Sequence, residues 1–279
     1  MKKFLLTSAA VLGISGAASA ADLAVKAPIV APVPVFSWTG VYIGIGGGTG
    51  WGTVERTWNR DVFLAPFINQ GLLPPFTAGS TFGSHPISGG FFGGQLGYNW
   101  QAGWAVFGIQ GDAHWADIDG RGDCFNGFLT LGFACHDKVK SFGSVTARLG
   151  VTAFDRGLIY AKGGWAWEET NRTLTPSGAD FLVLFTGVPG NNLTAVSLSQ
   201  SRSGWTFGAG VEYAFAPNWS AFIEYNHFDF GNKDQNGNLV LTAPVTVTLN
   251  SPLSTTVTEH FDVVKAGVNY KLDWLFARY

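Results

Sequence analysis

The chain has no long apolar run after its first twenty residues. None of its later segments reaches the eighteen or so consecutive apolar residues of a membrane-spanning helix. Charge is also scarce, because Asp, Glu, Lys and Arg make up only 13% of the residues. Aromatic residues reach 15%. An apolar composition without an apolar run leaves one membrane architecture, a closed β-barrel whose strands alternate between lipid-facing and lumen-facing side chains.

The first twenty residues have the three parts of a secretory signal peptide. Lys2 and Lys3 form the positive start, residues 4–14 are apolar, and Ala18-Ser19-Ala20 is a small-residue cleavage site. We therefore expect residues 1–20 to be removed after export.

Residues 21–37 contain three prolines and are predicted to be an extended periplasmic lead-in. The barrel is then expected over residues 38–279. Without the two signal lysines, 15 basic side chains face 19 acidic ones. This balance gives no electrostatic reason to expect nucleic acid as a partner.

Eight strand-like segments alternate between short and long connections. Short turns join the second segment to the third, the fourth to the fifth and the sixth to the seventh, which is typical of the short periplasmic turns and long extracellular loops of outer-membrane barrels. We predict an all-β fold, a single eight-stranded antiparallel transmembrane β-barrel in the bacterial outer membrane. The segments are residues 38–52, 89–100, 104–116, 141–153, 158–169, 202–215, 219–230 and 260–272.

Large aromatic residues gather near both ends of these segments, as expected of the two aromatic girdles at the lipid–water boundaries. The short-turn end has Trp100, Phe215, Trp219 and Tyr270, and the other end has Trp115, Trp165, Trp167 and Trp205. The segment VYIGIGGGTGWG (41–52) satisfies no register of the dinucleotide pattern G-x-G-x-x-G and lacks the lysine of a phosphate loop. Its alternate glycines are predicted to face the lumen and to leave room for long Arg and Lys side chains from the far wall.

Six charged residues fall on the inward rows of the third to eighth segments, three acidic and three basic. An eight-stranded barrel is just wide enough for side chains to fill, so these charges must be paired. We predict that Arg148 and Lys162 pair with Glu212, Glu224 or Asp112. One interpretation is a salt-bridged plug and the other a selective ion path. The six residues are Asp112, Arg148, Lys162, Glu212, Glu224 and Lys265.

The two cysteines, Cys124 and Cys135, lie close together in the chain, and an oxidising compartment favours a disulfide between them. His136 is the nearest other soft ligand, which makes a metal site the weaker alternative. The tripeptide Arg121-Gly122-Asp123 precedes Cys124 in a predicted outer loop and matches an attachment motif, although three-residue matches arise by chance.

A catalytic site has little support in the sequence. His114 and Asp112 share one predicted face and Ser144 lies on the next inward row, but nothing marks a nucleophile and no G-x-S-x-G motif is present. The sequence gives no reason to expect a cofactor or a metal.

Four stretches resemble the outer-membrane immunogenic proteins of alphaproteobacteria, which are small OmpA-like barrels often labelled porin family. The stretches are WTGVYIG (38–44), RLGVTAFDRGLIYAKGGWAW (148–167), GWTFGAGVEYAFAPNWSAFIEYNHFDFG (204–231) and VKAGVNYKL (264–272). The resemblance implies a surface antigen or envelope-integrity protein in the outer membrane and no particular activity.

The sequence therefore predicts a non-enzymatic outer-membrane protein with an envelope-structural and surface-exposed role. The alternatives are a narrow diffusion pore for small solutes and an adhesin that uses the extracellular loops. The expected partners are outer-membrane lipid and lipopolysaccharide, and the outer-membrane insertion machinery during biogenesis.

Overall fold

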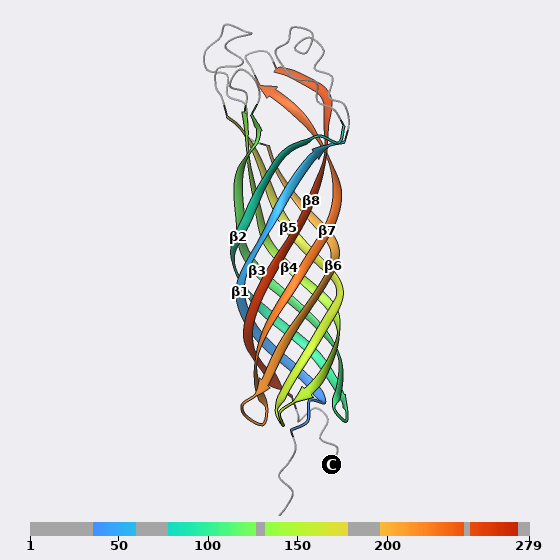
Figure 1. Cartoon of the computed structure of the whole chain (residues 1–279). Helices are drawn as coiled ribbons and strands as arrows, with labels where there is room; N and C mark the ends of the chain where they lie inside the picture. The colour runs from blue at the N-terminus through green and yellow to red at the C-terminus, as the bar shows by residue number, and fades with distance from the viewer. Residues whose placement is uncertain (1–35, 60–77, 127–131, 178–195, 243–245, 273–279) are drawn as a thin grey trace, which may run out of the picture. The chain divides into compact units, whose positions relative to one another are not determined.

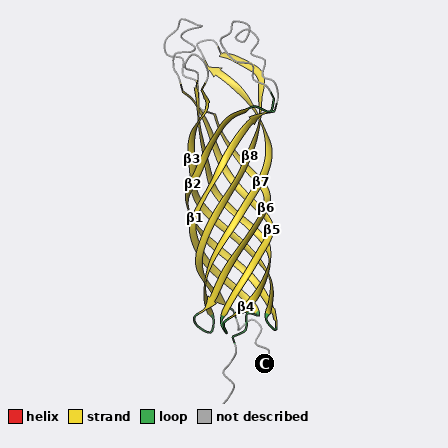
Figure 2. Cartoon of the chain, viewed as in Figure 1, coloured by secondary structure: helices red, strands yellow, loops and turns green. Residues whose placement is uncertain are grey.

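The fold is an all-β barrel, seen in a computed structural model (Figures 1 and 2). The structure describes residues 36–59, 78–126, 132–177, 196–242 and 246–272. Among these residues no helix is long and apolar enough to cross a membrane. The strands are β1 (Gly40–Trp58), β2 (Thr81–Ala102), β3 (Ala105–Asn126), β4 (Gly132–Ala153), β5 (Gly157–Ser177), β6 (Val196–Ala214), β7 (Trp219–Thr242) and β8 (Thr246–Lys271).

The eight strands pair with their neighbours in chain order, all antiparallel, and β1 pairs with β8 to close the barrel. The register can be followed from Tyr42 through every ladder, and it returns to β1 at Gly52, ten residues further along that strand. Such a stagger tilts the strands strongly against the barrel axis. The predicted fold is confirmed, and its lumen has room for side chains only.

The predicted alternation between lipid and lumen is also confirmed. On β1 the outward Ile45 is 68% exposed while the inward Tyr42 is 4% exposed. Outward tryptophans mark both girdles, with Trp100 56% exposed at the short-turn end and Trp115 66% exposed at the other. The apolar band between the girdles is the surface that lipid covers.

The strands extend beyond the outer girdle by more than the sequence predicted. β4 begins at Gly132 rather than residue 141, and β7 ends at Thr242 rather than residue 230. The inner ends agree with the prediction to within two residues. Beyond the girdle both faces of the wall meet polar surroundings, so the apolar alternation that reveals a lipid-facing strand disappears.

The inner end of the lumen is closed by Trp38, which precedes β1 rather than beginning it as the sequence predicted. Its side chain is 4% exposed and packs with Val106 and Leu158. Its backbone N–H donates to Gln101 Oε1 at 2.8 Å. Gly40 has φ 143°, a conformation that favours glycine and turns the chain from this segment into β1.

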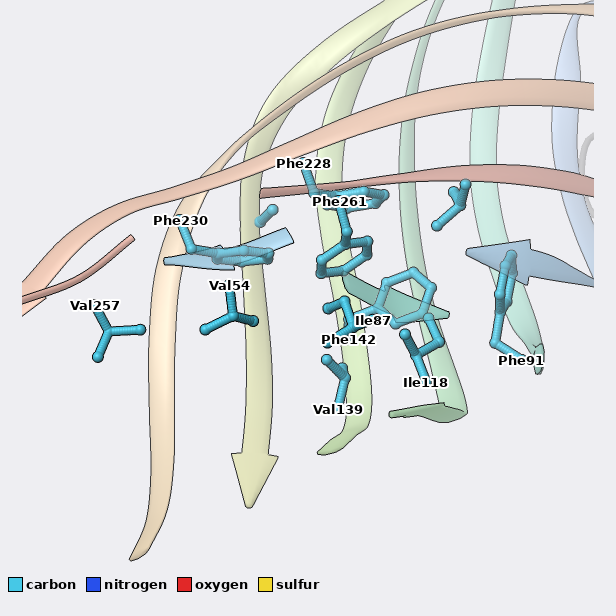
Figure 3. Packing of buried hydrophobic residues seen from close by; sticks show 12 residues of the cluster. Val54, Ile87, Phe91, Ile118, Val139, Phe142, Phe228, Phe230, Val257 and Phe261 are labelled. Carbon is cyan, nitrogen blue, oxygen red and sulfur yellow. The ribbon is translucent and has the colours of Figure 1, made fainter. Parts of the chain in front are cut away.

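An apolar layer crosses the lumen near the outer girdle (Figure 3). Phe142 is 1% exposed, and its ring centre lies 5.1 Å from that of Phe91, 5.3 Å from Phe228 and 5.4 Å from Phe261. His114 stacks on Phe142 with ring centres 4.9 Å apart. These four phenylalanines come from β2, β4, β7 and β8, so the layer joins opposite walls of the barrel.

Candidate functional site

The six charged residues predicted to face the lumen all lie there, between the Trp38 cluster and the apolar layer, and each is at most 5% exposed. Lys162 Nζ lies 2.7 Å from Glu224 Oε1 and 3.6 Å from Asp112 Oδ2. Lys265 Nζ lies 3.2 Å from the same Glu224, and Arg148 pairs with Glu212. Three cations and three carboxylates therefore neutralise one another in a space closed to water.

Amide and hydroxyl side chains join these ion pairs into a closed ring. Tyr42 Oη donates to Gln110 Oε1 at 2.9 Å, and Lys265 Nζ donates to Gln95 Oε1 at 2.9 Å. Further bonds of 2.7 Å run from Gln95 to Asn269 and from Asn269 to Glu212. This inner network draws on all eight strands. In order it runs through Glu212, Arg148, Tyr42, Gln110, Asp112, Lys162, Glu224, Lys265, Gln95 and Asn269.

Arg148 is the most enclosed cation of the inner network at 1% exposure. Its guanidinium carbon lies 3.5 Å from the centre of the Tyr160 ring, and its Nη1 donates to Tyr42 Oη at 3.3 Å. Planar stacking together with paired donors suits arginine better than lysine. Arg148 therefore packs and pairs at the same time.

Asp112, His114 and Ser144 meet as the sequence suggested, but their geometry is not that of a catalytic triad. Ser144 Oγ donates to Asp112 Oδ2 at 2.9 Å, while His114 Nδ1 lies 3.5 Å from the other oxygen of this carboxylate. An activated nucleophile bonds to its base rather than to the acid. The serine and the histidine instead serve as two further partners of Asp112.

A second charge network, which the sequence analysis missed, lies on the outer side of the apolar layer. Arg56 Nη2 lies 2.6 Å from Asp137 Oδ1, and Arg172 Nη1 lies 3.1 Å from the same oxygen. Glu259 pairs with Arg172 and accepts from Arg202 Nη1 at 3.1 Å. This outer network sits beyond Trp51 on β1, Trp167 on β5 and Trp205 on β6, outside the lipid band.

Asp137 is the centre of the outer network. Burial alone would raise the pKa of its carboxyl, but the hydrogen bond from His85 and the charges of Arg56 and Arg172 hold that pKa below its ordinary value. His85 Nε2 lies 2.9 Å from Asp137 Oδ2. The inward parity of β1, β5 and β8, continued past the girdles, points to Arg56, Arg172 and Glu259, whereas the bulge at Lys140 reverses the parity of β4 and hides Asp137.

Glu168 separates the outer network from the apolar layer. Its side chain is 0% exposed, and its nearest ion-pair contact is Arg202 Nη1 at 3.8 Å. The outer network therefore brings Arg56, Arg172 and Arg202 together with Asp137 and Glu259, and Glu168 lies at its inner edge.

The predicted disulfide between Cys124 and Cys135 is confirmed. The cysteines do not lie in a loop, as the sequence predicted, but on β3 and β4, and both face the lumen at no more than 1% exposure. Arg56 Nη1 lies 3.1 Å from Cys124 Sγ. The disulfide therefore closes the wall beside the outer network.

The tripeptide Arg121-Gly122-Asp123 also lies in β3 and not in a loop, paired with β4 from His136 to Ala134. Arg121 and Asp123 point outward, while Gly122 packs against His85, because a Cβ added there would lie 2.6 Å from His85 Cβ. An extended strand with its glycine turned inward differs from the exposed loop that the motif prediction assumed.

The glycines of β1 face the lumen as predicted, but they make room for different side chains. A Cβ at Gly46 would lie 3.1 Å from Phe222 Cζ, and one at Gly44 would lie 3.1 Å from Gln95 Cγ. The expectation of long Arg and Lys side chains against this wall is therefore wrong. The charged side chains pair nearer the middle of the lumen, and Phe222 lies between Lys265 and the wall, with Nζ 5.4 Å from its ring centre.

Among the described residues no three His, Cys, Asp or Glu side chains are grouped to hold a metal ion. The lumen contains four stacked layers. From the inner to the outer end they are the Trp38 cluster, the inner network, the apolar layer and the outer network.

A closed eight-stranded barrel with two aromatic girdles and an outward apolar band is a transmembrane β-barrel of the outer-membrane type. The family model described as the outer membrane protein beta-barrel domain matches residues 7–246. The chain belongs to this family, and its place is the bacterial outer membrane.

Its relatives include the 31 kDa outer-membrane immunogenic protein of Brucella melitensis, which is 33% identical over 97% of this chain and 100% of its own length. The 25 kDa outer-membrane immunogenic protein of Brucella abortus is 27% identical over 84% of this chain and 87% of its own length. Among solved structures, the outer membrane protease OmpT of Escherichia coli aligns over 86% of this chain and 99% of its own, with 10% identity and a TM-score of 0.45.

Proposed function

We propose that this protein is a non-conducting, non-enzymatic barrel that supports the outer membrane and carries surface-exposed segments beyond it. The observation that carries the proposal is the filled lumen. Two ion-pair networks stand on either side of a phenylalanine layer, and each of these layers draws on strands from opposite walls.

Conduction would require an ion to pass the apolar layer without water. Phe142 and Phe261 are at most 1% exposed, and their ring centres lie 5.4 Å apart. Transfer of an ion into such surroundings is strongly unfavourable. Polar layers on both sides hold their charges in pairs, so neither offers a free counter-ion to a passing solute.

A structural role also agrees with the way in which the networks connect the wall. Arg148 on β4 pairs with Glu212 on β6, and Lys162 on β5 pairs with Glu224 on β7. Each pair skips one strand, so it resists shear between strands that do not share a ladder. Removing one member of such a buried pair costs about 3–5 kcal/mol, because the other charge is left without a partner.

The narrow-pore alternative makes a different prediction for the inner network. If Arg148 were a gate, its removal would open a path, whereas in a plug the apolar layer and the outer network still close the lumen. The adhesin alternative has less support from the described residues, since Gly122 of its tripeptide is turned against His85.

Planar-bilayer recording of the purified barrel tests the proposal. We expect no steady conductance from the wild type and none from Arg148→Ala. The control Leu149→Ala changes the neighbouring side chain, which faces lipid and is 59% exposed. Steady conductance of the wild type, or a sharp rise in Arg148→Ala that Leu149→Ala does not show, would establish the pore instead.

A further inference from the structure

The outer face of β3, β4 and β5 changes character just beyond the outer girdle. The β3–β4 register shifts between Trp115 and Ile118, and the β4–β5 register shifts between Val139 and Ser141. Two residues of β3 thus lie opposite the single residue Lys140 of β4. Bulges of this kind re-aim side chains and are frequent next to functional sites.

These paired bulges place two lysines outward at the lipid boundary. Lys140 is exposed, and its neighbour Ser141 pairs with Trp115, the girdle tryptophan of β3. Lys138 is two residues further out on the same strand, with a side chain 40% exposed and Nζ 2.5 Å from Asp117 Oδ1. Exposed ion pairs of this type contribute little, so Lys138 can exchange Asp117 for another anion at small cost.

On β1 and β6 the outward position at the same height is not a lysine. The outward residue two positions beyond the girdle tryptophan is Thr53 on β1, after Trp51, and Ser203 on β6, beside Trp205. Among the described residues, β4 therefore carries two lysines directly beyond the outer girdle, where β1 and β6 carry Thr53 and Ser203. On the lipid side of the lysines, Trp115 on β3 pairs with Ser141 and is 66% exposed, and Trp165 on β5 pairs with Val145 of β4 and is 53% exposed.

The lipid-facing surface below the lysines is apolar and continuous. Val145 and Leu149 of β4 are 54% and 59% exposed. Trp165 stacks on Trp167 with ring centres 5.2 Å apart, and Trp167 lies over Gly143 of β4, where a Cβ would come 2.8 Å from its Cε2. An acyl chain against β4 therefore has aliphatic contacts below and indole rings at the level of its headgroup.

We propose that this face, formed by Lys138, Lys140, Trp115, Trp165 and Trp167, is a binding site for lipid A, the phosphorylated and acylated anchor of lipopolysaccharide. The two ammonium groups bind a lipid A phosphate, the indoles lie at the headgroup, and the acyl chains follow β4 toward Leu149. Basic side chains at a membrane surface attract anionic lipids in this way. The proposal goes beyond the structural role, and it holds whether or not the lumen conducts.

Acidic neighbours on the same face distinguish lipid A from a free anion. Asp117 has a side chain 75% exposed, and Glu169 on β5 is exposed opposite Ser141. These carboxylates repel a phosphate ion that arrives from solution. A lipid A phosphate is already held at this height by its acyl chains, so its high effective concentration overcomes the repulsion.

Thermal unfolding of the detergent-refolded barrel, followed by its heat-modifiable migration on gels, tests the site. The probes are lipopolysaccharide carrying its lipid A phosphates, the same lipid after dephosphorylation, and inorganic phosphate. We expect intact lipopolysaccharide to raise the unfolding midpoint, the dephosphorylated lipid to raise it less, and inorganic phosphate to leave it unchanged.

Variants identify the residues responsible. Lys140→Gln alone should reduce the phosphate-dependent part of the rise while leaving the Lys138–Asp117 pair and the baseline midpoint intact. The double variant Lys138→Gln/Lys140→Gln should abolish that part. The control Lys233→Gln removes an exposed lysine from β7, whose Nζ donates to Ser201 O at 2.8 Å, and should keep the whole rise.

Four results would overturn the proposal. The first three are an equal rise with intact and dephosphorylated lipid, an equal rise in the wild type and the double variant, and a loss in Lys233→Gln as large as in the double variant. The fourth is stabilisation by inorganic phosphate alone, which would assign the lysines to a free anion rather than to lipid A.

Discussion

The guanidinium of Arg56 reaches across the outer end of the lumen to the carboxylate of Asp137, with Nη2 2.6 Å from Oδ1. Arg56 belongs to β1 and Asp137 to β4, and the same carboxylate also binds His85 of β2 and Arg172 of β5. One aspartate therefore connects four strands at a level where lipid no longer supports the wall. Substitution of Asp137 and protonation of its carboxylate should therefore both weaken the outer network.

Asp137→Asn should destabilise the barrel by about 3–5 kcal/mol, because Arg56 and Arg172 lose the charge that compensates them in a buried site. Urea unfolding in lipid vesicles, followed by tryptophan fluorescence, measures the loss. Asp119→Asn is the matched control, since Asp119 is partly exposed and pairs with the partly exposed His136 at 3.2 Å. Equal stability of the two variants would show that the outer network contributes nothing.

Stability should also fall at acid pH through Asp137. Its folded-state pKa lies below the ordinary aspartate value of about 3.9, so it stabilises the barrel above that pH. That contribution is lost as the pH falls below about 4 through the lowered pKa. Unfolding midpoints measured from neutral to acid pH should fall less steeply in Asp137→Asn. Parallel curves would contradict the assignment.

The double variant Cys124→Ser/Cys135→Ser should lose about 3 kcal/mol, the chain-entropy value for so short a loop. A reductant should lower the unfolding midpoint of the wild type and leave the double variant unchanged. Comparing reduction of the wild type with the double substitution distinguishes the contribution of the covalent bond from that of sulfur packing. Reduction breaks the bond but keeps both sulfur atoms, whereas the substitution removes both. If the wild type is unfolded in the presence of reductant and its unfolding midpoint does not change, the disulfide does not stabilise the barrel.

Gly46→Leu should reduce the folded fraction, because its side chain would meet Phe222 and the backbone of β8. Gly94→Leu is the control, since Gly94 faces lipid and a Cβ there would have Gly44 O at 3.6 Å as its nearest neighbour. The heat-modifiable band on a gel reports the folded fraction of each. Equal folding of both variants would show that the inner glycine wall tolerates bulk.

The lipid-spanning half of this molecule could be predicted from sequence, whereas the outer half could not. Between the girdles lipid forces alternation, so residues such as Arg148 and Glu212 stand out as inward charges on apolar strands. Beyond Trp115 and Trp167 no such contrast exists, and the strands that carry Asp137 and Arg172 look like loops. The ion-pair partners also cannot be predicted from the sequence, because they depend on the strand register. A slip of one residue turns every side chain to the other face.

The extension of the strands beyond the girdle raises the outer rim of the barrel above the lipid surface. From Trp51 the wall of β1 continues to Trp58, which at roughly 3.3 Å per residue and a strong tilt raises the rim by more than 10 Å above the lipid. Salt bridges and a disulfide brace this part from within. Among the described residues the wall therefore continues beyond the girdle tryptophans as a collar that is cross-linked from within, rather than stopping at the membrane surface.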